Sequence, residues 1–196
     1  MRIKDVAAMV KACKRMVLVN TREDGKIVRQ HLLLGGMAMY PLDGMQAITP
    51  ETLLTIADVE ECEREKYTVD QADMSPYLFA MAEDAVEGER HAVQLKTILK
   101  LPWVELTAVT EEGGGETLFF PVKMLKPVKD MEQLELFTRE VDGGKTIIVK
   151  SGMMAVAAIA PSTSWARADQ VADLGSMFRA AVVLAEENEL KEAQEQ

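Results

Sequence analysis

The chain has few residues of the kinds that build disulfide frameworks and metal sites. Its 196 residues include two cysteines, Cys13 and Cys62, and two histidines, His31 and His91. Two thiols do not make a disulfide framework, and the four side chains show no zinc-ligand spacing. We therefore expect free thiols, no metal site and no cofactor, in a cytoplasmic protein. We expect His31 to be a structural or surface residue with satisfied hydrogen bonds.

Long apolar runs and catalytic motifs are also missing. The longest apolar run, Met153 to Ala160, is far shorter than the roughly 20 residues of a membrane helix. The N-terminus has no continuous apolar centre, which argues against a signal peptide. Gly113 to Gly115 lacks the ending of a phosphate loop and is flanked by glutamates. No nucleophile, base and orienting group can be assembled, so we predict that the protein is not an enzyme.

Acidic residues outnumber basic ones, but unevenly along the chain. The formal net charge is −10, which argues against a globally basic nucleic-acid binder. By segment the net charge is +5 for residues 1–41, −12 for 42–117, +1 for 118–161 and −4 for 162–196. The acid is therefore concentrated in the middle and the tail. The acidic cluster at residues 58–65 is expected to be a solvated helix face, because no glycine turn organises it as a calcium loop.

Apolar periodicity and turn signals predict an α+β protein. The helical spacing of Ile3, Val6 and Val10 predicts a helix over residues 3–14, and Thr49 followed by proline is a good helix start. Further helices are predicted at residues 76–84 and 121–131, and from about residue 164. The predicted strands cover residues 16–20, 26–34, 37–40, 91–99, 103–110, 117–120, 133–139, 145–149 and 153–160.

Two segments separated by about 117 residues share an order of elements. Thr21-Arg22-Glu23 aligns with Thr138-Arg139-Glu140, and an Asp-Gly turn follows each triplet. This order predicts two βαβββ units, although any two helix–hairpin–strand units look alike. The alignment leaves open whether Arg22 and Arg139 pair with their neighbouring glutamates or with phosphate.

Residues 117–161 resemble half of a DNA sliding-clamp (polymerase processivity factor) domain, and residues 1–41 do so loosely. The stretch reads TLFFPVKMLKPVKDMEQLELFTREVDGGKTIIVKSGMMAVAAIAP: a short strand, a proline, a helix with a central leucine, and three further strands. The resemblance implies a duplicated, clamp-like domain over residues 1–161 with an antiparallel sheet. Its repeats would be residues 1–41 and 91–161, with an acidic insertion at 42–90 and a C-terminal helix and polar tail at 162–196.

The resemblance also implies a non-enzymatic, DNA-associated accessory or processivity function in mobile-element or bacterial replication. The candidate contacts to the backbone of double-stranded DNA are Lys4, Lys11, Lys14, Arg15, Lys123, Lys126 and Lys129. The first four gather on one face of the first predicted helix, and the last three recur at every third residue. Such lysines make salt-sensitive phosphate contacts, or they simply solvate an outer helix face.

A second class of function stays open. The acidic segment or the C-terminal helix would dock a protein partner or a second copy, and the protein would have no DNA function. The thirteen methionines fit either class, because methionine fills core gaps and also forms adaptable binding surfaces.

Overall fold

The computed structural model describes residues 3–101, 104–114 and 116–162. The described helices are α1 (Ile3–Cys13), α2 (Pro50–Ile56) and α3 (Pro76–Ala82), with the 3₁₀ turns η1 (Glu61–Lys66) and η2 (Val122–Leu125). The described strands are β1 (Arg15–Glu23), β2 (Lys26–Leu34), β3 (Ala38–Pro41), β4 (Thr68–Asp73), β5 (Arg90–Leu101), β6 (Val104–Glu111), β7 (Thr117–Pro121), β8 (Leu134–Val141), β9 (Gly144–Ser151) and β10 (Met154–Ile159). The α+β class is therefore as predicted, and the helix predicted from residue 164 lies outside these residues.

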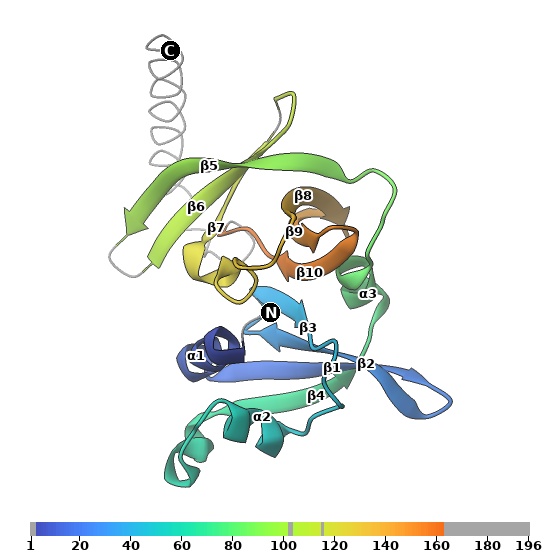
Figure 1. Cartoon of the computed structure of the whole chain (residues 1–196), viewed down its shortest axis with the longest axis vertical. Coiled ribbons are helices and arrows are strands. Elements are labelled where there is room, and N and C mark those ends of the chain that lie inside the picture. The colour runs from blue at the N-terminus through green and yellow to red at the C-terminus, as the bar shows by residue number, and fades with distance from the viewer. Residues whose placement is uncertain (1–2, 102–103, 115, 163–196) are drawn as a thin grey trace.

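All ten described strands belong to one continuous sheet. Its order is β4-β1-β2-β3-β10-β9-β8-β5-β6-β7. Neighbours are antiparallel, as predicted, except for β1 and β4, which run parallel. In Figure 1 the sheet curves around α1, with β5 and β6 above the helix and β1, β2 and β4 below it.

The centre of the sheet consists of two three-stranded meanders. Strands β1, β2 and β3 form one, and β8, β9 and β10 form the other. They meet where β3 pairs with β10, at Met39–Ala158 and Ala38–Ile159. The two meanders therefore stand in opposite orders on either side of this junction.

In each meander an Asp-Gly pair forms the first turn. Asp24 and Gly25 have φ values of 49° and 76°, and Asp142 and Gly143 have values of 52° and 74°. Two successive residues with positive φ form the tight turn that matches the twist of an antiparallel pair, and Asp-Gly adopts it at low cost. The turns predicted from these dipeptides are confirmed.

The acidic segment 42–90 is built into the sheet. Its strand β4 pairs with β1 along six residue pairs, from Arg15–Thr68 to Asn20–Asp73. Sequence patterning missed this strand because its sequence, TVDQAD, is polar and mostly exposed, as an edge strand can be. The two helices of the segment begin as the sequence predicts, since Thr49 and Ser75 each accept a hydrogen bond from a backbone N–H in the first turn.

The helix predicted over residues 121–131 is wrong. The chain forms only the 3₁₀ turn η2 there, followed by further turns. Lys126 N donates to the Lys123 oxygen and Val128 N to the Leu125 oxygen, which are bonds to the third preceding residue. Pro127 stands between these two donors and has no N–H, so the α-helical ladder cannot continue through it.

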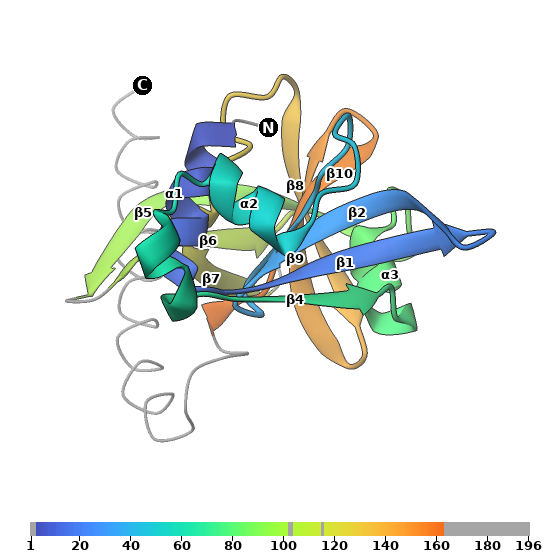
Figure 2. The same cartoon turned by 90° about the horizontal axis from the view of Figure 1, so that it is seen from below.

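The main core lies on the side of the sheet that carries α1, α2 and η2. It includes Val10 of α1, Leu53 of α2 and Met124 of η2, packed with side chains from the strands. Helix α3 covers a smaller cluster that includes Met39 and Ile148. Figure 2 shows α1 and α2 together, with α3 at the far end of the molecule. None of the described helices is long and apolar enough to cross a membrane.

A buried tyrosine ties the first meander to η2. Tyr40 of β3 has no exposed surface, and its hydroxyl donates a 2.7 Å hydrogen bond to the backbone oxygen of Met124. The two residues are 84 positions apart in the chain. This contact therefore joins the two halves of the chain inside the main core.

Replacing Tyr40 with phenylalanine tests this contact. The substitution leaves a buried carbonyl without its donor, so we expect Tyr40→Phe to lower the free energy of unfolding by about 1–2 kcal/mol. The measurement is urea denaturation followed by circular dichroism. Tyr77→Phe is the matched control: Tyr77 is 48% exposed, and its loss is expected within about 0.5 kcal/mol of zero. Equal losses in the two variants would contradict the role given to Tyr40.

Candidate functional site

The structure leaves all seven predicted backbone contacts exposed. Together they are named the basic face: Lys4, Lys11, Lys14, Arg15, Lys123, Lys126 and Lys129. Four come from the first meander and its helix, and three from η2 and the turns after it. Surface exposure is the first requirement for a phosphate contact, and every member meets it.

The helical grouping of the first four residues is only partly right. Helix α1 ends at Cys13, and Lys14 takes the left-handed conformation, with φ of 57°. Such a residue commonly closes a helix. Arg15 is the first residue of β1, so a helical wheel does not describe its direction. Lys4 and Lys11 remain on one helix face.

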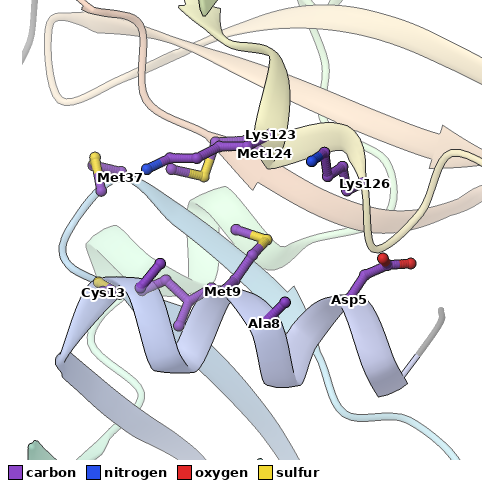
Figure 3. Close-up of a pocket in the computed structure, with 10 residues that line it drawn as sticks. Asp5, Ala8, Met9, Cys13, Met37, Lys123, Met124 and Lys126 are labelled. Atoms are coloured by element: carbon purple, nitrogen blue, oxygen red, sulfur yellow. The ribbon is translucent and has the colours of Figure 1, made fainter. Parts of the chain in front are cut away.

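A pocket of about 340 Å³ lies between α1 and η2. Helix α1 contributes Met9 and Cys13, the β2–β3 connection contributes Met37, and η2 contributes Met124 and Lys123. Figure 3 shows Met9 rising from α1 toward Met124, with the Lys123 and Lys126 side chains on the opposite side of the pocket. Two segments more than 100 residues apart in the sequence are therefore brought to the two sides of one apolar hollow.

Acidic residues lie beside one end of the basic face. Lys11 Nζ is 3.3 Å from an Asp58 carboxylate oxygen, just beyond α2. Glu63 of η1 pairs with Lys66, which lowers the pKa of the glutamate, and the charges of Lys14 and Lys11 lower it further. The cations nearest the acidic segment are thus partly neutralised.

The two aligned arginines pair with the acidic segment, and neither pairs with its neighbouring glutamate. Arg22 Nε donates to Asp73 at 2.9 Å, on the surface. Arg139 is 2% exposed and binds the Glu89 carboxylate together with the backbone oxygens of Ala80 and Glu83. In the described chain each arginine therefore pairs with an acid of residues 42–90, which is a partner that the sequence did not suggest.

Two carboxylates, the partly buried Glu89 and the buried Glu111, bind cations of the β5, β8 and β9 region. Glu89 also binds Lys150, whose Nζ lies 4.6 Å from the centre of the Phe137 ring. Such paired charges in a buried setting stabilise a structure only when every partner is kept. Sequence reasoning missed this ion pair because its members are separated by 61 positions.

The second carboxylate, Glu111, is 3% exposed. It binds Lys145, Arg90 and the Thr138 hydroxyl. The hydrogen bond from Lys145 is the largest cause that holds the pKa of Glu111 below its usual value. Glu111 and Glu89 are thus two acids of the negatively charged middle segment that act as counterions inside the protein.

His31 is not the satisfied residue that was predicted. It is 2% exposed in β2, and neither ring nitrogen has a hydrogen-bond partner among the described residues. Burial, and then the nearby charge of Arg29, lower the pKa of His31 to about 4. The ring is therefore neutral at physiological pH. No group of three or more possible ligand side chains that could hold a metal ion was found in the described residues, and Cys13 and Cys62 are both free thiols.

Comparisons with known proteins found no match: no family model fits the chain, and no curated protein or solved structure is similar to it.

The two aligned arginines make a matched pair for mutation. Arg139→Met leaves the partly buried Glu89 carboxylate and two backbone oxygens without their donor, so we expect a loss of about 3 kcal/mol in the free energy of unfolding. Arg22→Met removes an ion pair whose arginine side chain is 43% exposed, and we expect a loss of about 0–1 kcal/mol. The measurement is urea denaturation of both variants. Similar losses of unfolding free energy in the two would contradict the buried position of Arg139 and the surface position of Arg22.

Because the pKa of His31 is lowered in the folded protein, we expect the protein to lose stability in acid. The unfolded chain takes up a proton near pH 6.5, whereas the folded chain resists it down to about pH 4. Stability is therefore lost as pH falls between these values, by roughly 3 kcal/mol at the lower end. His31→Gln does not titrate, so the difference in unfolding free energy between wild type and variant should shift by that amount from pH 7.5 to pH 4. A difference that stays constant over this range would refute the assignment.

Proposed function

We propose that this chain is a non-enzymatic DNA-associated protein whose basic face contacts the phosphate backbone of double-stranded DNA. One observation carries the proposal: α1 and η2, from opposite halves of the chain, lie on the two sides of one pocket. Lys123 and Lys126 thereby lie across one pocket from α1, the helix that carries Lys4 and Lys11. A duplex is broad enough to touch both sets, because its backbone presents phosphates along its whole length.

The charges of this face are available for binding. Within the described chain, Lys11 is the one member with an ion pair, to Asp58. Lys4, Lys123, Lys126 and Lys129 are exposed, and no ion pair to another described residue is found for them. Because acidic residues stand beside Lys11 and Lys14, the strongest phosphate contacts are expected from these four lysines.

The arrangement of the meanders supports a clamp-like duplication. Each meander has three antiparallel strands and an Asp-Gly first turn, and the two meet in opposite orders at β3 and β10. A helical segment precedes each one, α1 in the first case and η2 in the second. A duplicated unit of this kind would present two related basic segments to one DNA molecule, as an accessory protein of bacterial or mobile-element replication would require.

Binding of a short labelled duplex, measured by fluorescence anisotropy from ~50 to 200 mM salt, tests the proposal. We expect weak binding that falls steeply with salt. The triple variants Lys4/Lys11/Arg15→Ala and Lys123/Lys126/Lys129→Ala should each weaken binding, and the second should reduce the salt slope by up to about 3.

A matched control removes three exposed lysines elsewhere. Lys26/Lys96/Lys100→Ala makes the same change in net charge at positions outside the basic face and should leave the slope within about one of wild type. The proposal fails if wild type does not bind at ~50 mM salt, or if the control weakens binding as much as the two test variants do.

A further inference from the structure

The pocket between α1 and η2 has the size and lining of a ligand site. Its volume of about 340 Å³ lies within the range of about 300–1,000 Å³ found for small-molecule sites. Three methionines line it, Met9, Met37 and Met124, one from each of three separate segments. Methionine side chains are flexible and polarisable, so they adapt to apolar ligands of irregular shape.

The charged groups around the pocket are unevenly placed. Lys123 and Lys126 border it from the side of η2, whereas Asp5 borders it from the side of α1 (Figure 3). No ion pair of either lysine to another described residue is found. A bound anion would therefore be attracted to the η2 side, which gives a ligand one preferred orientation.

We propose that this pocket binds a small amphiphile with an apolar body and one anionic head group, such as a carboxylate. The apolar body lies among Met9, Met37 and Met124, and the head group lies at Lys123 and Lys126. A neutral apolar molecule would gain no attraction from the two ammonium groups, and a cationic one would be repelled by them. The inference goes beyond DNA binding and does not depend on it, because the pocket is present whether or not the lysines contact phosphate.

The two free cysteines allow a direct test with decanoate as the probe. Cys13 lines the pocket, and Cys62 is exposed on η1, which contributes nothing to the pocket lining. In the Cys62→Ser variant Cys13 is the sole thiol, and decanoate should slow its alkylation by iodoacetamide at least threefold. In the Cys13→Ser variant Cys62 is the sole thiol, and its alkylation should not change. Equal slowing of both thiols, or none at Cys13, would overturn the proposal.

A charge comparison tests where the head group lies. Decanoate should protect Cys13 at lower concentration than decanol does, because the alcohol has the same chain without the charge. Lys123/Lys126→Ala in the Cys62→Ser background should raise the decanoate concentration needed roughly fivefold, through the loss of two exposed ion pairs. Lys26/Lys100→Ala, with the same charge change outside the pocket, should have no effect. Equal protection by decanoate and decanol in the unmodified pocket would overturn the charge assignment.

The same assay separates the two proposals. Failure of decanoate protection leaves the anisotropy measurements unaffected, and failure of DNA binding leaves the labelling rates unaffected. If the duplex protects Cys13 and decanoate does not, the pocket belongs to the DNA interface and the amphiphile proposal is wrong. Circular dichroism of each variant shows whether it is folded. The comparison of decanoate with decanol uses the chain with both lysines intact, so it remains valid even if the lysine variants do not fold.

Discussion

The pairing of β3 with β10 is the constraint on which the rest of the structure depends. The ladder is short, with register pairs at Met39–Ala158 and Ala38–Ile159. It nevertheless converts two separate meanders into one sheet and brings the chain's two halves to the same core. Tyr40 strengthens the junction from within, since its hydroxyl satisfies a buried carbonyl of η2. Helix α1 and η2, which both line the pocket, belong to the two halves of the chain that this junction joins.

Some acids in the middle of the chain act as internal counterions. Asp73 pairs with Arg22 in the first meander, and Glu89 pairs with Arg139 in the second. Both aligned arginines thus pair with an acid of this segment, Arg22 on the surface and Arg139 in a buried position. A buried arginine requires a full set of acceptors, and the segment supplies a carboxylate and two backbone oxygens.

The proposed ligand pocket and the proposed DNA interface share Lys123 and Lys126. Two anions cannot occupy the same ammonium groups without competing, so binding of an anionic amphiphile would reduce the affinity for phosphate. This link is a consequence of geometry, because Lys123 and Lys126 border the pocket and are also among the proposed phosphate contacts. If both proposals hold, a small molecule would regulate DNA association.

The local features of the fold could be predicted from the sequence. Strand β2, the Asp-Gly turns and the capped start of α2 are set by neighbouring residues, which is why patterning found them. The polar strand β4 and the partners of Arg139 could not be found this way, because long-range pairing alone makes them favourable. The pocket could not be predicted either, because segments far apart in the sequence line it. Sequence alone determined an α+β chain with two separated basic segments, and the tertiary structure decided that these segments meet, because the β3–β10 junction joins residues about 120 positions apart.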